Sequence, residues 1–77
     1  MLFPNKLFTY SESIISKFPI VLEKMEHKEY GVTELYIELN DKMIGVSEYM
    51  DVLDCLYALG AIEYDREKEV LKYANVK

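Results

Sequence analysis

The sequence predicts a mainly α-helical single domain with a small β-hairpin, in the element order of a winged helix-turn-helix. Three observations predict this class. Capping residues and prolines mark out helical stretches as far as Leu59. After Gly60 the apolar residues alternate, as they do in strands, around a charged turn. The length of 77 residues allows one domain with a small core.

Residues 1–10 are predicted to form an extended apolar N-terminal arm, and residues 11–77 to form the winged-helix-like domain. Pro4 and Asn5 disfavour a helix at the start of the chain. The arm nevertheless carries four large apolar residues, Leu2, Phe3, Leu7 and Phe8. Because termini are normally polar and frayed unless something holds them, the arm packs either on its own domain or on another subunit.

The first two helices are predicted on either side of Pro19. Thr9 and Glu12 fit a capping box, in which each side chain accepts a hydrogen bond from a backbone amide of the first turn. Pro19 interrupts the helix that follows, because its ring clashes with the preceding turn, yet proline also suits the first turn of a new helix. Residues 19–26 therefore form a second helix or a kinked continuation, which Gly31 closes.

Two further helices are predicted in the middle of the chain. Thr33 is a candidate N-cap, with Glu34 in the first turn, where the helix dipole favours a negative charge. The residues that follow also fit the alternation of a strand, but the cap favours a helix. Ser47 is the next candidate N-cap, for a helix over residues 48–59, and Gly60 stands where a left-handed C-cap residue belongs.

The helix over residues 48–59 carries no basic residue, whereas a DNA-reading helix presents Arg, Lys, Asn or Gln to base edges. Glu48, Asp51 and Asp54 gather with Cys55 on roughly one third of its circumference. The rest is apolar, and this apolar surface is broader than the stripe of an ordinary surface helix. Either the other helices of the domain cover it, or another chain does.

The hairpin is predicted from two alternating runs, residues 61–64 and 69–73. Its tip holds Arg66 and Lys68 interleaved with acidic residues, so we expect a mixed-charge surface there. These two cations are the candidates for a weak contact with DNA. Strong direct binding of nucleic acid is not expected from a chain with a formal net charge of −5, because cations supply most of that affinity.

No motif in the sequence predicts a catalytic, cofactor or metal site. His27 is the only histidine, and with Glu23 on the same helical face it makes only two metal ligands, fewer than zinc requires. Cys55 is interpreted as a buried structural thiol, because Asp51 and Asp54 beside it disfavour a reactive thiolate. We therefore expect no enzyme and no cofactor.

Composition predicts the compartment and the kind of partner. No apolar run reaches the length of a signal-peptide core or a membrane span, and one cysteine is not the pattern of a secreted disulfide scaffold. We expect a cytoplasmic protein that does not enter a membrane. Hydrophobic residues make up 51% of the chain, more than so small a domain easily buries, which indicates a protein partner.

Two stretches carry a resemblance to a known family. The first begins with PNKLF at Pro4 and continues through Tyr10 and Glu12 to SKFPIVLE; the second is LDCLYALGAIEYD, followed by LKY. The chain resembles the smallest middle components of ABC-three-component systems, of which Lamassu-type anti-phage defence is one kind. These bacterial conflict systems combine an SMC/Rad50-like ATPase, an effector and a small winged-helix subunit.

The resemblance implies a non-enzymatic adaptor that binds the ATPase and helps to hold the effector until foreign DNA is sensed. It implies no catalytic residue and no cofactor. The apolar arm and the tyrosines of the last helix supply the candidate residues for a protein interface, because aromatic side chains anchor interfaces well. These candidates are Leu2, Phe3, Leu7, Phe8, Tyr49 and Tyr57.

The residues leave two other functions open. One is a small winged-helix transcriptional regulator or anti-repressor that acts as a homodimer and touches DNA through Arg66 and Lys68. The other is a DNA-mimicking inhibitor, based on the acidic stripe of Glu48, Asp51 and Asp54.

Overall fold

Helices make up most of the fold, and a short hairpin follows them. The computed structural model describes the backbone of residues 3–74 and the side chains of residues 9–74. Within that part of the chain the elements are α1 (Phe3–Ser16), α2 (Phe18–Met25), α3 (Val32–Leu39), the 3-10 turn η1 (Asn40–Lys42), α4 (Val46–Ala58), β1 (Ile62–Asp65) and β2 (Val70–Tyr73). The predicted class, mainly helical with a small antiparallel hairpin, is confirmed.

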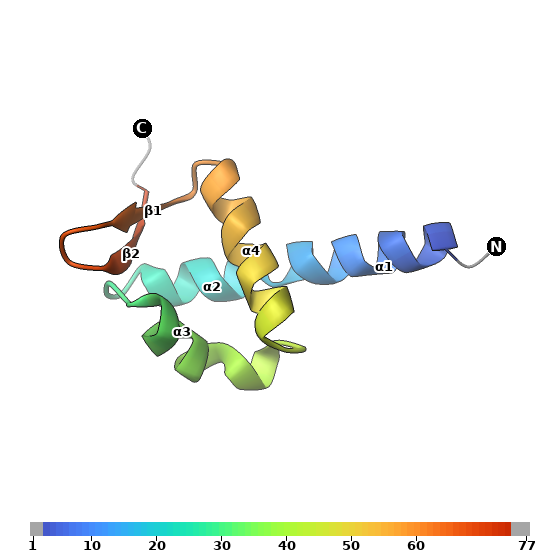
Figure 1. Ribbon diagram of the computed structural model, residues 1–77, viewed down its shortest axis with the longest axis horizontal. Coiled ribbons are helices and arrows are strands. Elements are labelled where there is room, and N and C mark those ends of the chain that lie inside the picture. The colour runs from blue at the N-terminus through green and yellow to red at the C-terminus, as the bar shows by residue number, and fades with distance from the viewer. Residues whose placement is uncertain (1–2, 75–77) are drawn as a thin grey trace.

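Helix α4 crosses the line formed by α1 and α2 close to where those two helices meet (Figure 1). Helix α3 and the hairpin lie toward the end of α2 that is remote from α1. The N-terminal half of α1 extends beyond the other elements, so the molecule is elongated, with principal extents of 46 × 28 × 20 Å.

The prediction of an extended N-terminal arm is wrong for residues 3–10, which belong to α1. Pro4 stands in the first turn of this helix, where a backbone N–H has no intrahelical acceptor and its loss costs little. Thr9 consequently lies inside the helix and does not cap it. Leu2 lies outside the described residues, as do the side chains of Phe3, Leu7 and Phe8.

A break at Lys17 separates α1 from α2, as the position of Pro19 predicts. Pro19 occupies the first turn of α2, and the amide of Val21 donates to the carbonyl of Lys17 at 3.1 Å. The second helix is therefore a new helix rather than a kinked continuation. It ends at Met25, six residues before the predicted stop at Gly31.

The N-cap of the helix that follows is Gly31 instead of the predicted Thr33. Gly31 is the N-cap residue of α3, and its amide donates to the side chain of Glu34 at 3.2 Å. The same carboxylate accepts a hydrogen bond from Lys28. These two hydrogen bonds lower the pKa of Glu34, the backbone one contributing most. The choice of helix over strand and the first-turn position of Glu34 are confirmed.

Gly60 ends α4 as predicted, in a Schellman motif. Its φ is +79°, a conformation that a residue with a Cβ rarely adopts. The Gly60 amide donates to Tyr57 at 3.0 Å and the Ala61 amide to Leu56 at 2.9 Å, so two helix-end carbonyls find partners. At the other end the helix begins at Val46, with Gly45 and not Ser47 as its N-cap.

The hairpin pairs Ile62 with Tyr73 and Asp65 with Val70. The Asp65 carboxylate shapes the turn by accepting hydrogen bonds from the amides of Glu67 and Lys68 at 3.0 and 3.2 Å. Leu71 also forms an isolated bridge with Tyr30, which precedes the N-cap residue of α3. This bridge ties the hairpin to the helical part of the fold.

Helix α4 supplies the centre of the core. Tyr49 is 1% exposed, its ring centroid lies 4.9 Å from that of Tyr36, and its hydroxyl donates to the carbonyl of Val32 at 2.6 Å. Burial raises the pKa of Tyr49 to about 12. The core residues are Ile14, Val21, Met25, Tyr30, Leu35, Leu39, Met43, Tyr49, Val52, Leu53, Leu56, Ile62 and Leu71.

Tyr49→Phe is expected to lower the free energy of unfolding by about 1 kcal/mol near neutral pH, because one buried hydrogen bond is lost. The native protein favours the protonated hydroxyl of Tyr49. The contribution of Tyr49 to the free energy of unfolding is therefore fully present below the ordinary tyrosine pKa. It falls as the pH rises toward about 12. Urea titrations at a series of alkaline pH values should show the advantage of the wild type shrinking. A difference between the two proteins that stays constant across the series would contradict this account.

Candidate protein interaction surface

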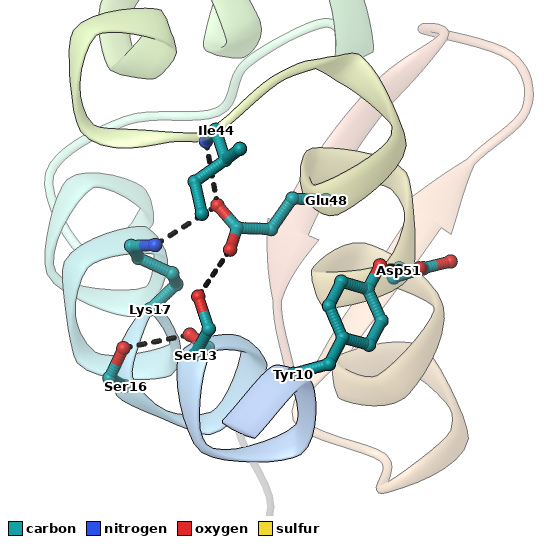
Figure 2. A network of polar contacts seen from close by, with 7 residues as sticks. All are labelled: Tyr10, Ser13, Ser16, Lys17, Ile44, Glu48 and Asp51. Atoms are coloured by element: carbon teal, nitrogen blue, oxygen red, sulfur yellow. Dashed lines mark hydrogen bonds and ion pairs between the residues drawn. The ribbon is translucent and has the colours of Figure 1, made fainter. Parts of the chain in front are cut away.

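A buried carboxylate joins α1, the α1–α2 break and α4. Glu48, in the first turn of α4, is 3% exposed. It accepts hydrogen bonds from the Ser13 hydroxyl at 2.5 Å, the Ile44 amide at 2.8 Å and the Lys17 ammonium at 3.0 Å (Figure 2). The expectation that Glu48 belongs to an exposed acidic stripe is wrong, because this turn of α4 faces α1 and the α1–α2 break.

The surroundings of Glu48 keep it charged. Burial alone would raise its pKa, but the hydrogen bonds from Ser13, Ile44 and Lys17 outweigh that effect, and the pKa lies below the usual range. A carboxylate held by three donors in this way is a structural group that positions α1 against α4.

A second contact fixes α1 on the solvent side of the same crossing. The Tyr10 hydroxyl donates to the Asp51 carboxylate of α4 (Figure 2). That hydrogen bond is the main reason that the pKa of Tyr10 is raised. Glu48 and Asp51 lie one turn apart, so α1 is held to α4 at two successive levels.

Beside this crossing lies a groove between α1 and α4, with a volume of about 340 Å³. The lining residues are Tyr10, Ser11, Ile14, Ile15 and Phe18 on one side, and Asp51, Asp54 and Cys55 on the other. The walls are mostly apolar, and the two carboxylates give the groove a negative edge. Cys55 is exposed here, so its interpretation as a buried thiol is wrong.

The two tyrosines predicted at an interface lie in opposite environments. Tyr57 is 63% exposed, near the C-terminal end of α4, and is available to a partner. Tyr49 is buried, and its hydroxyl is bonded within the chain. The prediction for Tyr49 is wrong because an aromatic residue suits a core as well as an interface, and only the packing of α3 on α4 distinguishes the two.

Several exposed apolar side chains were missed by the sequence analysis. Among the side chains of residues 9–74, the large apolar ones left exposed are Tyr10, Ile15, Ile37, Ile44, Val46, Met50, Tyr57, Leu59, Tyr64 and Tyr73. One of them had a signal in the sequence. Ile14 and Ile15 are adjacent on a helix, so only one can face the core; Ile14 does, and Ile15 is 59% exposed.

The hairpin tip has the mixed charge that the sequence predicts. Arg66 and Lys68 are both exposed, and the Lys68 ammonium lies 4.0 Å from Glu29. Lys72 lies 3.8 Å from Asp65, whose pKa is lowered chiefly by the backbone hydrogen bonds of the turn. The weak DNA contact of Arg66 and Lys68 stays a prediction.

The candidate pair His27 and Glu23 lies along a separate shallow pocket, which is also lined by Lys24 and Lys42. Within residues 3–74 no three His, Cys, Asp or Glu side chains group so as to hold a metal ion. Nor does any helix in that part of the chain have the length and apolar character needed to cross a membrane.

Replacing Glu48 by Gln is expected to lower the free energy of unfolding by about 1–3 kcal/mol, because Lys17 and the Ser13 hydroxyl lose a charged acceptor. The pKa of Glu48 is lowered in the native protein. Its contribution to the free energy of unfolding is therefore fully present above the pKa that Glu48 has in the unfolded chain. It is lost as the pH falls through the native pKa. The difference in the free energy of unfolding between the wild type and Glu48→Gln should therefore become smaller at acidic pH, as measured by denaturant titration.

Glu12→Gln is the matched control, since Glu12 is exposed on α1. It should change stability by no more than about 0.5 kcal/mol. Equal destabilisation by the two substitutions would contradict a special role of Glu48.

A match to a known protein family covers most of the chain. A family model described as ABC-three component (ABC-3C) system Middle Component 7 matches residues 3–71. No curated protein and no solved structure matches. The match runs from the start of α1 into β2 and agrees with the resemblance found in the sequence. The chain belongs to the Middle Component 7 family of ABC-three component systems.

Proposed function

We propose that this middle component is a non-enzymatic winged-helix adaptor that joins the SMC/Rad50-like ATPase of its system to the effector in an anti-phage complex. Membership of a multi-component conflict system supports protein partners. The observation that carries the proposal is the exposed apolar surface, in particular at the C-terminal end of α4.

Tyr57 and Leu59 are the strongest anchors of that surface. They are 63% and 70% exposed, although both are large apolar residues. Ile37 and Ile44 are likewise exposed on α3 and on the segment before α4. So many exposed apolar side chains on one small domain are typical of a protein that is covered by a partner.

The order of the elements supports the winged-helix part of the proposal. Helix α2, the bridging residue Tyr30, α3, α4 and the hairpin follow in the sequence that such domains use. In this order α4 takes the place of the helix that would read DNA. Helix α4 has no Lys or Arg, and with Glu48 buried its remaining charged residues are Asp51 and Asp54, so its surface favours a protein over a phosphate backbone.

The chemistry of the buried Glu48 carboxylate supports a non-enzymatic role. Glu48 accepts hydrogen bonds from three donors and has a lowered pKa. A general acid or base instead needs a pKa near the working pH and an open approach to its proton. We therefore assign Glu48 a structural role.

The test is co-expression of the three components with an affinity tag on the ATPase. Tyr57→Asp combined with Leu59→Asp is expected to weaken capture of this chain at least about tenfold, because a charge is placed in an apolar contact. Phe3→Asp combined with Phe8→Asp is expected to leave the domain folded and to abolish assembly. Circular dichroism should show native helix content in both variants.

Thr33→Asp is the control, because it adds a negative charge at an exposed site on α3 where the helix N-terminus favours it. This variant should assemble normally. Purification of the tagged ATPase without the wild-type chain would overturn the adaptor proposal.

Charge reversal at the hairpin distinguishes an adaptor from a DNA-binding regulator. Arg66→Glu with Lys68→Glu is expected to leave assembly unchanged, because both side chains lie at the exposed tip of the hairpin. A regulator would instead show salt-dependent DNA binding that this double variant removes. Fluorescence anisotropy with a labelled duplex at low and high salt measures the difference.

A further inference from the structure

We propose that the groove between α1 and α4 is occupied by the N-terminal half of α1 from a second copy of this chain, so that two copies form a two-fold symmetric dimer. The proposal goes beyond the adaptor function and is tested on the isolated chain. Failure of one therefore does not entail failure of the other.

The residues that line the groove suit the binding of an apolar segment that carries a positive charge. Ile15 is 59% exposed on one wall, and Tyr10, Ile14 and Phe18 add further apolar surface. The charged residues among those lining the groove are Asp51 and Asp54, both negative. An occupant that brings apolar side chains and a cation satisfies both features.

The chain itself contains such a segment. Residues 3–8 read Phe-Pro-Asn-Lys-Leu-Phe, so three of the six are large and apolar, and Lys6 is the only charge. The backbone of this segment is helical and extends beyond the other elements (Figure 1). A second molecule can therefore bind this segment as a helix that is already formed.

Helical geometry makes α1 self-complementary. Positions 4, 8, 11 and 15 recur at the spacing of one helix face. In an antiparallel pair of α1 helices centred between residues 9 and 10, position 8 of each copy lies beside Ser11 of the other, and position 4 beside Ile15. A two-fold contact requires this reciprocity, in which one patch serves both copies.

The same arrangement places the α1 of each copy over the α4 of the other. Positions 3 and 7 lie on the face of α1 that also carries Tyr10 and Ile14, the residues that meet α4 or the core in the same chain. In the neighbouring copy these positions would approach the edge of α4 that bears Cys55. Position 6, a lysine in the sequence, would then lie toward Asp51 and Asp54.

The first test is sedimentation velocity of the isolated chain over a range of concentrations. The expected species has twice the 9.1 kDa mass of one chain. Ile15→Asp should weaken self-association by about 100-fold or more, because it places a charge in the apolar contact. Ile37→Asp is the control: Ile37 is 65% exposed on α3, away from the groove lining, and its variant should remain dimeric.

The second test uses the natural thiol and does not depend on the folding of a variant. Cys55 is the only cysteine of the chain and lines the groove. Alkylation of dilute protein with a bulky maleimide should shift the chain to monomer, whereas Cys55→Ser treated in the same way should stay dimeric.

Three results would overturn the proposal. One is a chain that stays monomeric at every concentration. Another is a dimer that resists both Ile15→Asp and the alkylation of Cys55. The third is a monomer whose Cys55 becomes protected from alkylation only in the assembled three-component complex, which would assign the groove to another component.

Discussion

The position of α1 depends on one buried charge. Burying a carboxylate costs several kcal/mol unless donors replace the water that it loses. Glu48 is compensated by Ser13 on α1, by Lys17 at the helix break and by the backbone of Ile44. Because these donors come from three segments, a shift of α1 along or away from α4 would leave the charge uncompensated. The groove beside this crossing, walled by α1 and α4, owes its shape to the same constraint.

Much of the fold was predictable because its signals are local. Gly60 ends α4 in the left-handed conformation that the sequence predicts, and the alternation after it gives the hairpin. The choice of a helix for α3 was also sound, since Glu34 lies in its first turn and Leu35 and Leu39 are buried one turn apart. In each case the decisive residues lie within a few positions of the feature that they determine.

The errors arose where a decision depends on distant parts of the chain. A helical wheel groups Glu48 with Cys55, but it does not say where along α4 another helix crosses. Because α1 crosses near the N-terminal turn of α4, the carboxylate is buried and the thiol is exposed, the reverse of what their polarity suggests. Tyr49 was misplaced for the same reason. The prediction of an extended arm failed because Pro4 was taken to disfavour a helix, whereas a proline is also well suited to the first turn of one.

The distribution of charge explains how an apolar surface can select its partner. Exposed residues such as Ile15 and Tyr57 would attract any apolar surface if they stood alone. Asp51 and Asp54 stand at the edge of the groove, so an acidic segment entering it meets repulsion, while a segment with a cation gains attraction. In the proposed contact, apolar side chains would supply affinity and the carboxylates would decide which segment is accepted. Selection of this kind suits a small subunit that must bind its own complex among many other proteins.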